Sequence, residues 1–266
     1  MSESTTLVEQ HPRAPQMSTG ARGRSLSVFF PCYNDGGTIG SMVILAYDVL
    51  RRVTDDYEVI VVNDCSHDSS AQVLKELQRF YPDLRVVTHE RNRGYGGALR
   101  AGFAHATKDW VFYTDGDAQY NPGELTILLN ALRPGVDMVN GYKITRSDPF
   151  YRIVIGKLYH WAACLAFGLR IRDVDCDFRL IHRAIFETVH LESDSGVICV
   201  EMMKKIQDAG YRIAEVPIHH YHRVYAGSQF FRLNRIVAAL IGFSRLWWRM
   251  RMASLVARRP SKVLSP

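Results

Sequence analysis

Hydrophobic and polar residues follow two alternating patterns along most of the chain. Short apolar runs, typical of buried strands, are separated by longer stretches in which apolar residues recur at helical spacing. The runs predict strands over residues 26–30, 57–62, 84–88, 110–113 and 136–140, and the spacing predicts helices over 38–51, 69–80, 96–106, 121–132 and 200–209. Strands that alternate with helices in this way indicate an α/β fold, with a mainly parallel sheet covered on both faces.

The beginning of the chain differs from this alternating part. Residues 1–24 mix Ser, Thr, Pro, Gln and Gly without periodicity, which predicts a disordered leader. The chain has 266 residues, 47% of them hydrophobic. That is enough for one sizeable domain and a short appendage, but not for two full domains.

Polar residues directly after the predicted strands are the places to look for function. In parallel sheets, ligands bind beyond the carboxyl ends of the strands. The first strand leads into Asp35, the second into residues 63–68 and the fourth into residues 115–119. For Ser66 and Asp68 the simpler interpretation is that they cap the following helix, since Ser and Asp are good N-caps.

Capping does not explain Asp115 and Asp117. These two aspartates stand one residue apart, directly after an apolar run. Several carboxylates held close together repel one another unless a cation lies between them. Because oxygen ligands suit Mg²⁺ or Mn²⁺, which also bind diphosphate oxygens, the pattern predicts a site for one of these ions.

Two further patterns have more than one interpretation. The glycine-rich residues 94–102 suggest a dinucleotide-binding loop, but the spacing is not G-x-G-x-x-G, and we favour a tight turn with a close helix–sheet contact. His219, His220 and His222 suggest a zinc site. An extended segment would put only His220 and His222 on one face, and no further ligands are evident, so we disfavour zinc.

Four motifs at successive strand ends, taken in order, resemble one known family. They are Pro31-x-Tyr33-Asn-Asp35, Val61-Val-Asn63-Asp64-x-Ser66-x-Asp68, Asn92-x-Gly94 and Asp115-Gly-Asp117. This order is similar to the inverting family 2 glycosyltransferases of GT-A fold, and within them to the polyprenyl-phosphate (dolichol-phosphate) mannosyl- and glucosyltransferases. The similarity covers residues 25–229, which implies a GT-A, Rossmann-like domain there and leaves residues 230–266 as a C-terminal helix and tail.

The resemblance implies a donor site for a nucleotide-sugar of the GDP-mannose or UDP-glucose type. Asp115 and Asp117 would hold the metal, with Gln119 as a further ligand. Asp35 stands where many members have Glu, Asn63 where many have Asp, and Asp177 where they have a small residue. The donor-binding residues would be Pro31, Tyr33, Asp35, Asn63, Asp64, Asp115, Gly116 and Lys143.

The resemblance also implies an acceptor site. Residues 173–179 (Asp-Val-Asp-Cys-Asp-Phe-Arg) lie where the family has D-x-[TD]-[SC]-[GA]-F-[RK]. Asp173 and Asp175 would act as base or orient the acceptor, and Arg179 would contact phosphate. An ion pair between Asp173 and Arg179 with only a structural role is equally consistent. The acceptor-binding residues would be Asp173, Arg223 and Ser228, the last two in a basic turn suited to phosphate, and the catalytic residues Asp117, Asp175, Arg179 and Arg223.

The C-terminal segment is strongly basic. Residues 223–266 contain nine Lys and Arg residues and no Asp or Glu. On a helical wheel, an apolar arc of Ile236, Val237, Leu240, Ile241, Phe243, Trp247 and Trp248 lies opposite a basic arc of Arg232, Arg235, Arg245 and Arg249. A basic amphipathic helix rich in Trp is typical of binding to an anionic membrane surface. Packing of this helix on its own domain, or on a second copy in a homo-oligomer, is the alternative.

The remaining features bear on location and on the class of function. Five scattered cysteines and no apolar leader indicate a cytoplasmic protein, and no uninterrupted apolar run reaches the roughly 18 residues of a membrane span. Our first hypothesis is a peripheral enzyme at the inner membrane face that transfers a hexose to a polyprenyl phosphate. The second is a soluble glycosyltransferase acting on a hydroxyl of a saccharide, protein or small molecule. The third, a nucleic-acid-binding module, is disfavoured because the strand ends are acidic and no stripe of basic and aromatic residues runs through the core.

Overall fold

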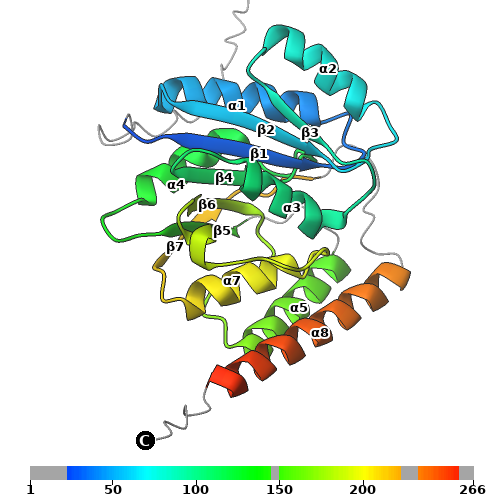
Figure 1. The fold of residues 1–266 in the computed structure, drawn as a ribbon, viewed down its shortest axis with the longest axis vertical. Coiled ribbons are helices and arrows are strands. Elements are labelled where there is room, and N and C mark those ends of the chain that lie inside the picture. The colour runs from blue at the N-terminus through cyan, green and yellow to red at the C-terminus, as the bar shows by residue number, and fades with distance from the viewer. Residues whose placement is uncertain (1–22, 145–149, 223–232, 258–266) are drawn as a thin grey trace, which may run out of the picture.

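The computed structural model describes residues 23–144, 150–222 and 233–257. These residues form one seven-stranded sheet in the order β3-β2-β1-β4-β6-β5-β7 (Figure 1). The five strands predicted from the apolar runs are all present. The strands are β1 (Leu26–Cys32), β2 (Tyr57–Asn63), β3 (Arg85–Thr88), β4 (Trp110–Thr114), β5 (Met138–Lys143), β6 (Phe178–His182) and β7 (Ile213–Ile218).

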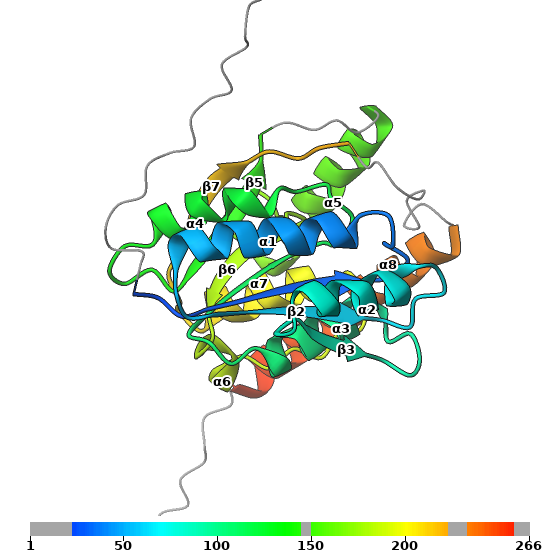
Figure 2. The same cartoon turned by 90° about the horizontal axis from the view of Figure 1, so that it is seen from above.

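Helices cover both faces of the sheet, as the alternating pattern predicts (Figure 2). On one face lie α1 (Ile39–Val53), α2 (Ser70–Phe80) and α4 (Leu125–Ala131). On the other lie α3 (Gly94–His105), α5 (Phe150–Phe167), α6 (Ile185–Thr188), α7 (Ile198–Asp208) and α8 (Leu233–Ala257). The predicted helix over residues 121–132 is a 3₁₀ turn, Pro122–Glu124, that continues into α4.

The sheet is mainly parallel, with one exception that matters for the site. The pairs β1–β2, β1–β4, β2–β3 and β5–β7 are parallel. β6 lies between β4 and β5 and is antiparallel to both. As a result β6 begins at the edge where the parallel strands end, and the segment before it, residues 168–177, comes to that edge.

Burial on both faces explains why the parallel strands are mostly apolar. In β1, Val28 and Phe30 belong to the core on the α1 side, whereas Phe29 belongs to the core on the α3 side. The ring of Phe29 packs edge-on against Phe103 of α3, with 5.0 Å between ring centroids. Strands of this kind have no solvent-facing side, so almost all of their residues are apolar. The polar Ser27 of β1 is buried as well, and its hydroxyl donates to the carboxylate of Glu58 in β2 at 2.6 Å.

Gly102 of α3 confirms the predicted close contact between helix and sheet. A Cβ atom built on Gly102 would lie 2.3 Å from the ring of Phe29, closer than atoms can approach. Gly40 of α1 offers a contrast, since its Cβ would lie 3.5 Å from Val73, an ordinary contact distance.

We therefore expect Gly102→Ala to lower the free energy of unfolding by about 1–3 kcal/mol, because the methyl group overpacks the core against Phe29. The matched control Gly40→Ala should be neutral, or stabilising by up to roughly 1 kcal/mol, since Ala is the better helix former. Urea denaturation of the two variants measures both effects. Equal stability of Gly102→Ala and wild type would show that α3 can move off the sheet without cost.

α8 packs on the domain along one side only. The ring of Phe243 lies 5.0 Å from that of Phe167 in α5, and Leu246 is buried in the core shared with α7. The other side leaves four residues of the predicted apolar arc exposed: Leu240, Ile241, Trp247 and Trp248. The arc is thus not one face, because Phe243 packs inward.

Arg249 of α8 also departs from the wheel. It is assigned to the solvated basic arc, but its guanidinium pairs with Glu192 at 2.6 Å and with Glu201 of α7 at 2.9 Å. The side chain of Arg249 points inward because it pairs with the buried carboxylate of Glu201. A helical wheel shows one segment only, so it does not reveal this partner on α7. The arc members at residues 232–237 lie outside the described side chains.

Two other predictions fall largely outside the described residues. The predicted leader, residues 1–24, is described only at Gly23 and Arg24, and the basic turn with Arg223 and Ser228 is not described. Among the helices that the structure describes, none is long and apolar enough to cross a bilayer.

Candidate active site

The loops that follow β1, β2 and β4 meet at one edge of the sheet, because these neighbouring strands run parallel. Each loop holds one non-glycine residue in left-handed conformation: Asn34 (φ 58°), Cys65 (φ 59°) and Ala118 (φ 61°). No other non-glycine residue of the described chain has a positive φ. For Cys65 and Ala118 the conformation costs about 1–2 kcal/mol each. Strain of this kind concentrates at functional sites, which makes this edge the candidate site.

The loop after β4 lies directly on the loop after β1. The hydroxyl of Thr38 donates to the carbonyl of Gly116 at 2.7 Å. A Cβ on Gly116 would lie 3.0 Å from the carbonyl of Pro31 and 3.6 Å from a carboxylate oxygen of Asp35. The same carboxylate accepts the backbone N–H of Tyr33 at 3.1 Å. Four residues predicted to bind the donor, at positions 31, 33, 35 and 116, therefore lie together.

Asp68 and Ser66 fasten the loop after β2 to the loop after β1. Asp68 accepts the backbone N–H of Ser70, the first residue of α2, at 2.9 Å, although the N-cap position itself is Ser69, whose side chain makes no capping hydrogen bond. The second carboxylate oxygen of Asp68 accepts the N–H of Gly36 at 2.9 Å. Ser66 does not cap α2, contrary to the prediction, since its hydroxyl accepts the N–H of Asn34 at 3.1 Å. Both side chains thus shape the strand-end loops.

Asn63 and Asp64, also predicted to bind the donor, are almost fully buried. A carboxylate oxygen of Asp64 lies 2.6 Å from Nδ1 of His89 and accepts the N–H of Arg93 at 2.8 Å. Asn63 accepts the N–H of Ser66 at 3.1 Å. Asp64 therefore fixes the loop between β3 and α3 beside the site, and a direct contact with the nucleotide stays a prediction.

Asp115 and Asp117 occupy the centre of this edge. One carboxylate oxygen of Asp115 accepts the hydroxyl of Tyr95, from α3, at 2.7 Å. Asp117 is 5% exposed and accepts the N–H of Gln119 at 3.1 Å. Burial, together with the nearby carboxylates of Asp177 and Asp117, raises the pKa of Asp115 well above its usual range.

A divalent cation fits this arrangement. Positive charge placed between Asp115 and Asp117 would offset the repulsion that raises the pKa of Asp115. Among the described residues, no group of three or more His, Cys, Asp or Glu side chains could hold a metal ion by itself. Mg²⁺ typically takes one or two carboxylates from a protein and completes its shell with water and phosphate oxygens.

Gln119, the predicted further metal ligand, links this loop to the segment after β7. The side-chain amide of Gln119 donates to the backbone carbonyl of Tyr221 at 3.3 Å, and the backbone carbonyl of Gln119 accepts the N–H of Tyr221 at 2.8 Å. The chain therefore reaches His222, where the predicted basic turn of residues 222–229 begins, from a position beside the loop of Asp115 and Asp117.

The three histidines of this segment have different surroundings. His219 lies 3.0 Å from a carboxylate oxygen of Glu124, His220 is buried with its ring 5.1 Å from that of Tyr120, and His222 is exposed. All three are described, and they do not converge on one metal position.

Arg179 is fully buried, which contradicts the predicted contact with acceptor phosphate. Its Nε donates to Asn140 at 2.9 Å, its Nη2 to the carbonyl of Val174 at 2.6 Å, and its Nη1 to the hydroxyl of Tyr113. Nη1 also lies 3.4 Å from the carboxylate of Asp177. The structural ion pair is therefore the better interpretation of Arg179, with Asp177 and not Asp173 as its partner.

The same contacts explain the acid at position 177. The Asp177 carboxylate accepts hydrogen bonds from the hydroxyl of Tyr113 at 3.3 Å and the thiol of Cys199 at 3.1 Å, besides pairing with Arg179. Two residues apart along an extended segment, Asp177 and Arg179 share one face, a signal present in the sequence. The Asp177 carboxylate is also close enough to Asp115 to contribute to its raised pKa.

Asp173 and Asp175 lie beside Lys143 at the end of β5. The ammonium of Lys143 donates to the carbonyl of Asp175 at 2.7 Å, and Asp173 accepts the N–H of Asp175 at 3.0 Å. Burial raises the pKa of Asp175 to about 7. The positive charge of Lys143 lowers this pKa and the negative charge of Asp173 raises it, but burial has the largest effect. Lys143, predicted to bind the donor, is thus placed with the predicted acceptor residues.

Tyr95 has no role in the sequence-based prediction, although it holds Asp115. The first turn of α3, which carries Tyr95, is fixed from the other side by residues 192–194. The N–H of Gly96 donates to the carbonyl of Asp194 at 2.8 Å, and Glu201 accepts the N–H of Ser193 at 2.8 Å.

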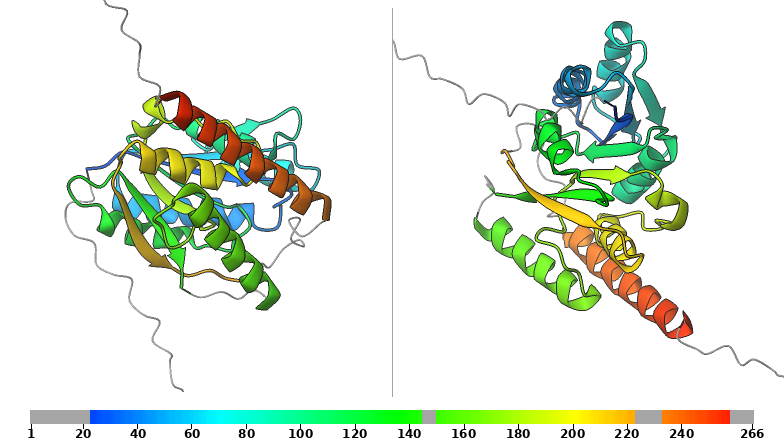
Figure 3. Two further views of the ribbon diagram at one scale, coloured as in Figure 1. Left: turned by 90° about the horizontal axis from the view of Figure 1, so that it is seen from below. Right: turned by 90° about the vertical axis from the view of Figure 1, so that its left-hand side faces the viewer.

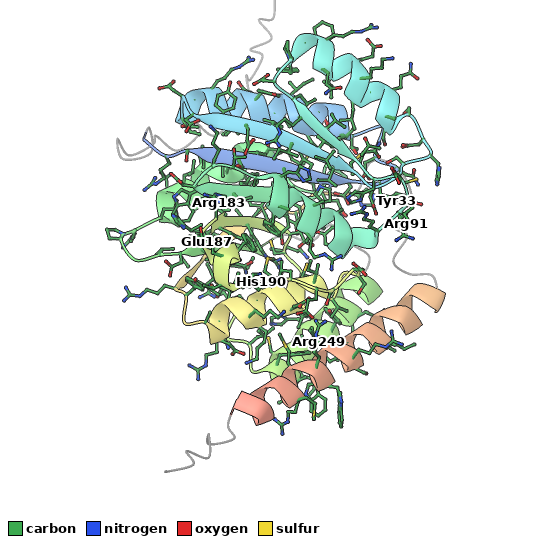
Figure 4. All side chains as sticks on the ribbon, viewed as in Figure 1. Tyr33, Arg91, Arg183, Glu187, His190 and Arg249 are labelled. Atoms are coloured by element: carbon green, nitrogen blue, oxygen red, sulfur yellow. The ribbon has the colours of Figure 1, made fainter. Side chains whose placement is uncertain are left out.

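Arg91 has no predicted role either. Figure 4 shows it at the same end of the strands as Tyr33, and its side chain is exposed there.

Comparisons with known proteins bear on this site. The chain matches Glycosyl transferase family 2 over residues 27–190. It is also similar to the undecaprenyl-phosphate 4-deoxy-4-formamido-L-arabinose transferases of Yersinia enterocolitica and Yersinia pestis, at 26% identity over 217 residues in each case. The alignments cover 80% of this chain and 65% of each relative, so the chain spans less than two thirds of their length.

Solved structures show the same fold. Glucosyl-3-phosphoglycerate synthase from Mycobacterium tuberculosis, in complex with UDP, superposes with a TM-score of 0.62 at 19% identity, covering 84% of this chain and 80% of that one. A mannosyltransferase from Pyrobaculum calidifontis, in complex with GDP-Man and Mn²⁺, has a TM-score of 0.59 at 23% identity, covering 81% and 61%. The predicted GT-A fold is confirmed, and the chain belongs to glycosyl transferase family 2.

Proposed function

We propose that this protein transfers a hexose from a nucleotide-sugar to a polyprenyl phosphate, with Mg²⁺ or Mn²⁺ as cofactor and with inversion at the anomeric carbon. The observation that carries this proposal is the acidic centre of Asp115 and Asp117 at the carboxyl ends of parallel strands. The names of the relatives support a polyprenyl-phosphate acceptor. Structural neighbours that hold Mn²⁺ with UDP-glucose or GDP-Man support the donor and the cation.

The donor half of the site answers the main difficulty of the reaction, the departure of a nucleoside diphosphate. A divalent cation, when bound, supplies positive charge to the leaving diphosphate as a Lewis acid. Asp115 and Asp117 would hold it, and the hydroxyl of Tyr95 keeps Asp115 in position. Tyr33 and Asp35, on the adjoining loop, would border the nucleoside.

The acceptor half of the site has the charge that a phosphate needs. A phosphate monoester is anionic at neutral pH, so its oxygen attacks without a general base. Lys143 supplies one cation beside the Asp173–Asp175 loop. Arg223 and Ser228, outside the described residues, would complete the phosphate contacts. Below its pKa of about 7, Asp175 is protonated and would donate a hydrogen bond to a phosphate oxygen.

One observation favours a second candidate, transfer to a hydroxyl group. A hydroxyl acceptor requires a base, and a carboxyl group with a pKa near the operating pH is well suited to that role. Asp175, with a pKa of about 7, meets this condition. The two candidates share the donor half and differ only in what Asp175 does.

We also propose that the protein acts as a peripheral protein at the cytoplasmic face of the membrane, where a polyprenyl phosphate would be embedded. The exposed Leu240, Trp247 and Trp248 of α8 support this location. Amphipathic helices with exposed Trp and basic residues lie in the interface of anionic membranes.

The proposal is tested by incubating the protein with labelled GDP-mannose or UDP-glucose, Mn²⁺ and a polyprenyl phosphate, followed by organic extraction. We expect label in the organic phase with one of the donors, and none when EDTA is present or the lipid is omitted. Label found only in water-soluble products would favour the hydroxyl acceptor. Absence of transfer from any nucleotide-sugar would contradict both candidates.

A further inference from the structure

We infer that α5 joins α8 in one membrane-binding surface, and that this surface sets the acceptor loop of Asp173 and Asp175 against an anionic bilayer. The inference rests on the proposed function and extends it, because it assigns a lipid partner to a helix outside the basic tail.

The outer side of α5 is apolar along its described length. Five large hydrophobic residues are exposed there at helical spacing: Val154, Ile155, Leu158, Trp161 and Leu165. Trp161 is 64% exposed and Leu165 70% exposed. Such spacing puts them on a single face, since residues three, four and seven apart lie along one side of a helix. The inner side of α5 packs on the domain through Ala163 and Phe167.

α8 presents a second exposed apolar stripe at the same end of the molecule. Leu240, Ile241, Trp247, Trp248 and Met252 are exposed, and Trp248 is 63% exposed. Figures 1 and 3 show α5 and α8 side by side, at the end opposite α2. The Phe243 ring lies 6.0 Å from that of Tyr159 and 5.0 Å from that of Phe167, so the two helices are in contact.

The charges of the two helices are of one sign. Neither Phe150–Phe167 nor Leu233–Ala257 contains an Asp or Glu. Lys157 of α5 and Arg245 and Arg251 of α8 are exposed beside the apolar stripes. Near an anionic lipid surface, each such cation strengthens binding by roughly fivefold. Apolar side chains with a basic border are typical of proteins that lie in the interface of such a surface.

A second copy of the chain is a poorer occupant of this face. Symmetric dimers bring the same patch of both subunits together. Here that would place Lys157, Arg245 and Arg251 opposite their own copies, with no acid on either helix to compensate. Charge therefore favours the anionic bilayer over self-association.

The position of α5 gives this surface a functional meaning. His160, on the inner side of α5, accepts the backbone N–H of Val174 at 3.3 Å, and Val174 stands between Asp173 and Asp175. Only α5, a layer of about 10 Å, then separates the acceptor loop from lipid. A phosphate at headgroup level would lie close to the acceptor half of the site.

The test is binding of the full-length protein to vesicles of phosphatidylcholine with and without phosphatidylglycerol. We expect binding to the anionic vesicles, a blue shift of Trp fluorescence, and weakening of both as salt rises. The double variant Leu158→Glu/Trp161→Glu should bind at least about tenfold more weakly, because two exposed apolar anchors become charged. The matched control is Phe80→Glu on α2, where Phe80 is 78% exposed at the opposite end.

Several outcomes would overturn the inference. The first is a wild-type protein that does not bind anionic vesicles at low salt. The second is an α5 double variant that binds as tightly as Phe80→Glu. The third is a dimer in sedimentation that Leu158→Glu dissociates into monomers. Circular dichroism checks that the variants are folded. Transfer to a short, water-soluble prenyl phosphate separates this inference from the proposed function. If only the membrane-surface inference is wrong, the wild type still transfers sugar to the water-soluble prenyl phosphate. If the proposed function is wrong, the wild type does not transfer sugar to this acceptor either.

Discussion

Asp117→Ala is expected to lower sugar transfer by about 10²–10³-fold or more while the protein stays folded, because the donor diphosphate loses the charge that compensates its departure. Asp117 lies on the turn after β4, next to Ala118, and its side chain is 5% exposed but belongs to neither hydrophobic cluster of the core. The measurement is turnover at saturating nucleotide-sugar and Mn²⁺, with the melting temperature taken in parallel.

A binding readout makes this prediction independent of turnover. Mn²⁺ added with a nucleoside diphosphate should raise the melting temperature of the wild type, since a ligand that binds only the folded state stabilises it. The same addition should leave Asp117→Ala unchanged. Asp48→Ala is the control, because Asp48 is an exposed acid in an ion pair with Arg52 on α1. Full activity in EDTA, or an active Asp117→Ala variant, would rule out the metal role.

The parallel half of the sheet could be predicted because the local sequence pattern and the burial of the strands in the folded protein favour the same structure. β1, β2 and β4 are buried on both faces, so their sequences are mostly apolar, with Ser27 and Glu58 as buried polar exceptions. β6 was not predicted, since its sequence Phe-Arg-Leu-Ile-His carries the buried Arg179. That arginine is stabilised by Asn140, Tyr113 and Asp177, and their proximity in space is not visible in a local pattern.

α5 escaped prediction for a different reason. Its buried side carries Ala163 and Phe167, but its exposed side is apolar as well, with Leu158 and Trp161. The contrast between faces that marks an amphipathic helix is therefore weak. The same property limits the helical wheel of α8, which groups residues by direction but does not reveal which side packs on the domain.

The candidate site was located by a topological rule and not by the side chains themselves. Because parallel strands end at one edge, Asp35 and Asp115 could be placed together before their contacts were known. The contacts that set their chemistry are long-range. Tyr95 reaches Asp115 across 20 residues of sequence, and Asp177 raises the pKa of Asp115 from the antiparallel side of the sheet.

The pH dependence of transfer is expected to identify the acceptor through Asp175, whose pKa is about 7. If the acceptor is a phosphate, protonated Asp175 donates a hydrogen bond to it. The rate should then fall as pH rises through about 7, where the carboxylate forms and repels the phosphate. If the acceptor is a hydroxyl, Asp175 must be ionised to take the proton, and the rate should rise over the same range.

We expect the first pattern, and two substitutions test it. Asp175→Asn removes the titration, so the fall near pH 7 should disappear while the rate stays within about tenfold of wild type, because an amide still donates to phosphate. Arg223→Ala should cost roughly 10–100-fold, the value of a hydrogen bond to a charged group. The phosphate itself titrates with a pKa of about 6, which affects both enzymes equally, so only the difference between their profiles reports on Asp175. Loss of 10²–10⁴-fold in Asp175→Asn beside a mild Arg223→Ala would instead identify a general base and a hydroxyl acceptor.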